Sequence, residues 1–155
     1  MTRVLAIGEC MVELAPQPEG DLYRLGYAGD TLNTAWYLRR LLPETDRVDY
    51  LTAVGSDAIS DRLVAFLAGS GIGTGHVLRR ADRTVGLYLI QLSGAERSFA
   101  YWRGQSAART LADDPAVLAR ALAGADLAYV SGITLAILDA AGRQTLLADL
   151  PCAFV

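Results

Sequence analysis

The chain has 155 residues, of which 52% are hydrophobic and 20% charged, and its net charge at pH 7 is −3. Its basic residues are all arginine, which excludes a phosphate-loop lysine and a Schiff-base lysine, and the acidic balance argues against nucleic-acid binding. One histidine and two cysteines cannot supply a closed zinc site of four Cys or His ligands.

Strand and helix patterns alternate along the chain. Short apolar runs such as RVLAI, at residues 3–7, are typical of buried strands, and Asp30 is a suitable N-cap for the first helical pattern. In chain order we expect a strand at 3–7, a helix at 30–42, a strand at 48–54, helices at 57–68 and 116–123, a strand at 127–130 and a helix at 139–150. This order predicts an α/β fold with a parallel central sheet.

Four further β segments fall between these elements and predict a small second sheet. They lie near residues 11–15, 22–27, 85–92 and 97–103. The last two are rich in β-branched and aromatic residues and are separated by Ser-Gly-Ala-Glu, which predicts a hairpin.

The glycine-rich segment GSGIGTG, at 69–75, resembles a nucleotide-binding loop only superficially. It fits G-x-G-x-x-G in no register and follows a helix rather than a strand, so we interpret it as a helix C-cap and turn. His76 comes next, and we expect it in a turn and exposed to solvent. Cys10 has no activating base in view, and we assign it no chemistry.

Membrane and export signals are not predicted. The longest apolar stretch, 121–138, contains Asp126, and Glu9 interrupts the N-terminal apolar run too early for a signal peptide. With two widely separated cysteines as well, we expect a cytoplasmic protein with no membrane partner.

Three segments together resemble the ribokinase (PfkB) family of carbohydrate kinases. They are GECMVEL at 8–14, GYAGDTLNTAWYLRRL at 26–41 and GLYLIQLSGAERSFAYWRGQSAA at 86–108. Within that family, GDTLNTA together with YWR is most similar to 2-keto-3-deoxygluconate kinases. The resemblance implies a Rossmann-like ribokinase fold: a largely parallel central sheet with helices on both faces, and the small second sheet as a β lid. It also implies phosphorylation of a small sugar acid at its terminal hydroxyl, with ATP and Mg²⁺ as cofactors.

Kinases of this family are longer and carry a Gly-Ala-Gly-Asp motif, whose aspartate is the catalytic base and which is absent here. We therefore expect residues 1–155 to be the N-terminal, sugar-binding part of a truncated kinase. The C-terminal half, missing here, would hold the base and most of the ATP and Mg²⁺ contacts, so we assign no catalytic or metal-binding residue. We expect the chain alone to be inactive.

Polar residues at the start of the helix at 30–42 are the first candidates for binding a sugar. Taken alone, Gly29 and Asp30 read as a tight turn with a helix cap, and Asn33 as a solvated amide. The resemblance implies instead that all three contact the sugar. Glu13, after the first strand, could equally be a surface charge of the lid, and the resemblance implies that it faces the sugar.

The predicted hairpin supplies the candidates for recognising an acid. Tyr101 and Arg103 share one face of a strand, and Tyr88 lies on the other strand. A guanidinium beside phenols suits a 2-keto acid, whereas the alternative is an exposed aromatic–arginine face. With the resemblance we favour acid recognition by Arg103.

Two other functions remain open from the sequence. One is half of a fructokinase-like or other neutral-sugar kinase of the same family, and the other is a non-catalytic sugar-binding fragment. We also expect a homo-oligomer formed through the lid in the complete enzyme, because an open hairpin edge needs covering.

Overall fold

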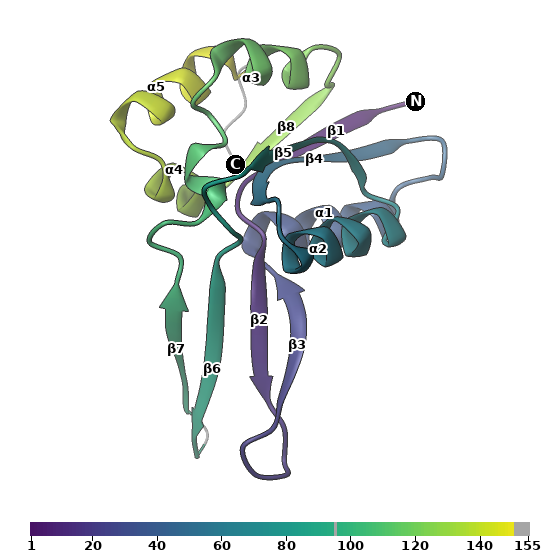
Figure 1. Ribbon diagram of the computed structural model, residues 1–155. Coiled ribbons are helices and arrows are strands. Elements are labelled where there is room, and N and C mark those ends of the chain that lie inside the picture. The colour runs from purple at the N-terminus through teal and green to yellow at the C-terminus, as the bar shows by residue number, and fades with distance from the viewer. Residues whose placement is uncertain (95, 151–155) are drawn as a thin grey trace.

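The computed structural model describes residues 1–94 and 96–150 (Figure 1). One sheet is entirely parallel. Its strands, in their order across the sheet, are β5 (Gly73–Arg80), β4 (Arg47–Gly55), β1 (Arg3–Ile7) and β8 (Leu127–Val130). Residues 151–155, which we included in the predicted sugar-binding part, lie outside the described residues.

Mostly apolar sequence in β1 and β4, interrupted in β4 by the buried polar residues Asp49 and Thr52, lets this sheet be buried on both faces, as is usual for parallel sheets. Side chains alternate between the faces. Leu5 of β1 and Leu51 of β4 join one hydrophobic cluster, whereas Ala6 and Tyr50, their neighbours along the strands, join the other. The predicted parallel central sheet is therefore confirmed.

Helices cover both faces (Figure 1). One cluster contains residues of α1 (Asp30–Leu41) and α2 (Ala58–Gly69). The other contains residues of the 3₁₀ turn η1 (Ala107–Thr110), α3 (Pro115–Leu122), α4 (Gly132–Ile137) and α5 (Ala140–Asp149). The short helix α4 was not predicted. No helix among the described residues has both the length and the apolar character to cross a membrane.

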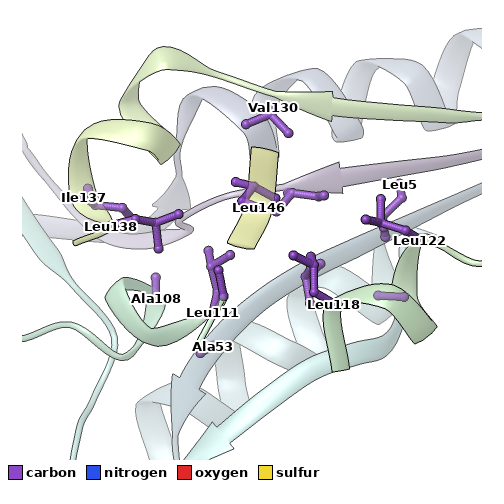
Figure 2. Packing of buried hydrophobic residues seen from close by; sticks show 14 of the residues in the cluster. Leu5, Ala53, Ala108, Leu111, Leu118, Leu122, Val130, Ile137, Leu138 and Leu146 are labelled. Carbon is purple, nitrogen blue, oxygen red and sulfur yellow. The ribbon is translucent and has the colours of Figure 1, made fainter. Parts of the chain in front are cut away.

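Leucine side chains fill the second of these clusters. Figure 2 shows Leu118 of α3, Leu146 of α5 and Leu111 gathered over Leu5 and Ala53 of the sheet. Full burial of each such leucine stabilises the fold by roughly 1.5–3 kcal/mol relative to exposure. This packing holds β1, and with it the residues that follow β1, in a fixed position.

The second sheet projects from the parallel sheet as two long hairpins (Figure 1). Its strands, in order, are β3 (Tyr23–Ala28), β2 (Met11–Pro16), β6 (Leu87–Ser93) and β7 (Glu96–Trp102). Each hairpin is antiparallel, and β2 and β6 join the two hairpins through a short parallel pairing. The predicted small second sheet is confirmed. Ala95, in the predicted hairpin turn, is outside the described residues.

Three local predictions were wrong. Asp30 is the first residue of α1 and not its N-cap: Gly29 takes the cap position, and Asp30 Oδ1 accepts the N–H of Thr31 at 2.7 Å. His76 lies in β5 rather than a turn and is half-buried, with Nε2 2.8 Å from Nη2 of Arg3. The hairpin strand that we extended to 103 ends one residue earlier, because Arg103 leaves the ladder with β6.

Candidate functional site

The candidate site lies where the parallel sheet reverses its strand order. After β1, the next strands of this sheet, β4 and then β5, lie on one side of β1, whereas the last strand, β8, lies on its other side. Ligands in open α/β sheets bind beyond the carboxyl ends of the strands at such a reversal. Here Glu9 follows the end of β1, and Ile133 belongs to α4, which follows β8.

A pocket of about 250 Å³ occupies this place, and its lining comes from the second sheet, from α4 and the start of α1, and from the segments that follow β1 and β7. Six of the seven predicted site residues line it: Gly29, Asp30, Asn33, Tyr88, Tyr101 and Arg103. Glu9, Met11, Phe99 and Ile133 complete the lining. The folded chain thus brings together residues that are far apart in the sequence.

Glu13, the seventh predicted residue, lies on a larger neighbouring pocket of about 620 Å³. Asn33 lines both pockets, and the Tyr88 hydroxyl donates a hydrogen bond to Glu13 Oε2. Glu13 therefore reaches the first pocket only through Tyr88. Partial burial, followed by the hydrogen bond to this carboxylate, raises the pKa of Tyr88, so the side chain stays a neutral phenol at physiological pH.

The start of α1 approaches the end of β1 closely. Gly29 has an extended backbone, with φ 167°, so its conformation does not demand a glycine. The space does, because a β-carbon there would overlap the carbonyl oxygen of Glu9. The Gly29 carbonyl accepts the N–H of Asn33 at 2.8 Å, which fixes the first turn of the helix against the pocket.

Aromatic side chains form the wall of the pocket on the second sheet. Tyr88 and Tyr101 are directly opposite each other in the β6–β7 ladder, with ring centroids 5.9 Å apart. Phe99 lies 6.1 Å from Tyr101 on the same strand, also measured between centroids. These spacings are those of interacting aromatic rings, so the wall combines rigid apolar surface with phenolic hydroxyls.

Glu9 is the residue of the pocket to which sequence reasoning gave no role. It is buried and forms an ion pair with Arg103 through Oε2 and Nη2. The Arg103 guanidinium carbon also lies 5.8 Å from the ring centroid of Tyr101. A carboxylate directly after a buried strand was the available signal, but nothing local in the sequence identifies its partner.

Cys10, beside Glu9, is not a nucleophile in this arrangement. Complete burial, and then the nearby charge of Glu9, raises the pKa of its thiol far above physiological pH. The pocket therefore offers recognition groups: a guanidinium, phenols, a carboxylate, an amide and a helix start. Such a set can bind and orient a small polar molecule that carries a carboxylate.

Comparison with known proteins identifies the family. The model of the pfkB family carbohydrate kinases matches residues 1–150. The chain belongs to this family. It is 41% identical over 154 residues to a 2-dehydro-3-deoxygluconokinase from Haemophilus influenzae and 42% identical over 148 residues to one from Dickeya dadantii. These matches cover 97% and 93% of this chain but only 49% and 47% of the relatives, so the chain spans about half their length.

Solved structures confirm the ribokinase-type fold. A 2-dehydro-3-deoxygluconokinase from Thermotoga maritima has a TM-score of 0.81 at 21% identity, and the match covers 96% of this chain and 46% of that one. A fructokinase with bound ATP from Xylella fastidiosa has a TM-score of 0.74 at 22% identity, with coverage of 95% and 46%. At such identities the likeness concerns the fold alone.

Proposed function

We propose that this chain is the acceptor-binding half of a 2-keto-3-deoxygluconate kinase. The complete enzyme would transfer the γ-phosphoryl group of ATP to the terminal hydroxyl of the sugar acid. The identity of 38–42% to relatives named 2-dehydro-3-deoxygluconokinase is the observation that carries this proposal. This half would bind and orient the acceptor, which lowers the barrier to transfer by holding the hydroxyl in line with the phosphate.

The chemistry of the pocket supports an acidic acceptor. Arg103 would bind the carboxylate, because a planar guanidinium matches a planar carboxylate with two parallel hydrogen bonds. The phenols of Tyr88 and Tyr101 would donate to the neighbouring carbonyl and hydroxyl oxygens. Asp30 and Asn33 would bind hydroxyls of the sugar, since both line the same pocket at the start of α1.

Among the described residues there is neither a phosphate loop nor a cluster of three possible metal ligands. The segment 69–75, the one candidate for a phosphate loop, ends α2 and leads into β5 through backbone bonds such as Ile72 N–H to Leu67 O. Within 1–94 and 96–150, no three His, Cys, Asp or Glu side chains gather as metal ligands. We therefore place ATP, Mg²⁺ and the catalytic base mainly in the other half of a longer protein.

The second sheet would act as the lid of the complete enzyme and exclude water from the bound sugar. We further propose that lids of two copies pack together. Apolar side chains support this, since Trp102 is 60% exposed and Leu92 57% exposed. Only monomer in size-exclusion chromatography of the complete enzyme at high concentration would contradict it.

A phosphoryl-transfer assay tests the proposal. The extended protein, in which this chain is joined to the part of the Haemophilus influenzae relative that it does not match, is given MgATP and 2-keto-3-deoxygluconate. We expect phosphorylated acid, detected by mass, from the extended protein and none from the 155-residue chain. Product at an enzyme-like rate from the chain alone would overturn the assignment to one half.

A variant of Arg103 separates an acidic from a neutral acceptor. Arg103→Lys keeps the positive charge beside Glu9 but loses the fork, so we expect KM for the acid to rise about tenfold. KM for ATP should not change. Fructose used in preference to the acid, together with a negligible effect of Arg103→Lys, would favour the fructokinase-like alternative. No product from either sugar would favour a non-catalytic sugar-binding fragment.

A further inference from the structure

Glu9 is the most deeply buried charged side chain of the pocket, with 2% of its side chain exposed. A carboxylate removed from water loses its hydration, and a protein retains such a group only where a partner compensates. The function proposed above gives this residue no task.

Arg103 is the partner of Glu9. The two groups touch through Nη2 and Oε2, but the angles make no hydrogen bond, and within the described residues neither Glu9 oxygen has any other hydrogen-bond partner. Nε and Nη2 of Arg103 are also buried without one, whereas 22% of the Arg103 side chain remains exposed. The arginine is therefore fixed on one side by Glu9 and open on the other to the pocket.

Gly86 provides the space for this pair. A β-carbon at Gly86 would lie 2.6 Å from Glu9 Oε1 and 3.2 Å from the β-carbon of Arg103. The backbone there cannot easily retreat, because the Gly86 carbonyl accepts the N–H of Val12 at 2.9 Å. The absence of a side chain at this position lets a residue that follows β1 reach a residue that follows β7.

We propose that Glu9 is a positioning residue that holds the Arg103 guanidinium in the orientation that binds the acceptor's carboxylate. This inference rests on the function proposed above. A free arginine side chain has many rotamers, and ordering it upon binding costs conformational entropy. Glu9 removes that cost before the acceptor arrives. Because Glu9 follows β1 of the parallel sheet and Arg103 follows β7 of the second sheet, the pair also fixes the guanidinium relative to the start of α1.

Steady-state kinetics of the extended protein with MgATP and 2-keto-3-deoxygluconate tests the role of Glu9. Glu9→Gln keeps the shape and removes the charge, so we expect KM for the acid to rise about tenfold. We expect kcat and KM for ATP to stay within about twofold, because the effect is on acceptor binding alone. Glu9→Asp keeps the charge on a shorter side chain and should give an intermediate KM. Glu44→Gln, the same change at an exposed carboxylate outside the pocket, is the matched control.

Each other result overturns the inference in a recognisable way. An unchanged or lowered KM for the acid in Glu9→Gln would mean that Glu9 does not position the arginine. A lower kcat together with a higher KM for both the acid and ATP, and a lower melting temperature, would mean that Glu9 acts only on folding. An unmodified extended protein that fails to phosphorylate the acid would overturn the proposed function and this inference with it.

Discussion

The two sheets of the molecule use their apolar residues in opposite ways. In the parallel sheet, side chains such as Leu5 and Tyr50 are wholly buried between two layers of helices. In the second sheet, Tyr101 is 52% exposed and Trp102 60% exposed. The first sheet therefore contributes more of the buried core, whereas the second leaves large aromatic side chains exposed, as our proposals for ligand binding and lid contact require.

Both sheets have edge strands, which among the described residues are β5 and β8 in the parallel sheet. Within the described residues, β3 and β7 each pair with one neighbour and form the edges of the second sheet. Backbone groups on such edges are free to pair with another chain, and proteins normally cover them. Among the candidate site residues, Tyr101 thus lies on an edge strand whose side chains are largely exposed.

The largest expected effect is on the free energy of unfolding, and it comes from a substitution in the hydrophobic core. Leu5→Ala in β1 should lower the free energy of unfolding by about 3 kcal/mol, because it leaves a cavity between the sheet and α3. Leu92→Ala in β6 should change it by less than about 0.5 kcal/mol at protein concentrations low enough to keep the lids of two copies apart, since that side chain is then mostly in water. Urea unfolding of the extended protein, followed by circular dichroism, measures both. Equal losses would contradict the division between the sheets.

Replacing Arg103, which follows the second sheet, should nevertheless lower the free energy of unfolding as much as a change in the core. Arg103→Met leaves the buried Glu9 carboxylate without its counter-charge, which should lower the free energy of unfolding by about 3 kcal/mol. The double variant Arg103→Met with Glu9→Gln removes both charges and should recover most of that loss. The same urea titrations give the coupling between the two residues. Additive losses in the double variant would show that the pair does not link the two sheets.

Much of the fold could be predicted from the sequence because its signals are local. Apolar runs located three of the parallel strands, β1, β4 and β8, to within a residue or two but missed β5, and runs of β-branched and aromatic residues located the second hairpin of the second sheet. Six of the candidate site residues, among them Gly29 and Asp30, line one pocket, and their role in binding a ligand stays a prediction. Their convergence on one pocket follows from the topology, which sequence patterns describe only coarsely.

The contacts that could not be predicted join distant parts of the chain. Glu9, after β1, meets Arg103, after β7, and the space at Gly86 that permits this contact has no signature beyond a glycine in a strand-like run. The prediction for His76 failed for a similar reason. A glycine-rich sequence favours a turn locally, whereas pairing with β4 along six register positions makes this segment a strand.

His76 gives the smallest expected effect. Its Nε2 must accept from Arg3, because a guanidinium has only donors, so the ring is neutral with its proton on Nδ1. Partial burial, and then the charge of Arg3, lowers the pKa of His76 below its ordinary value of 6.5. The unfolded chain therefore takes up this proton at a higher pH than the folded one, and stability falls as the pH drops below 6.5.

We expect the melting temperature to decrease as the pH is lowered from about 7.5 to about 5.5. The decrease should be smaller in His76→Gln, because the glutamine amide oxygen accepts from Arg3 and does not titrate. The difference between the two melting curves isolates His76, because every carboxylate is common to both proteins. Identical pH dependence would show that the ring is not held neutral. The effect should be small, because Arg3 also binds Asp49 at 2.7 Å and the carbonyl of Ala121 at 2.9 Å. Protonation of His76 removes one acceptor from a network that keeps the others, and this network surrounds Arg3 at the start of β1, whereas the pocket lies beyond the end of that strand.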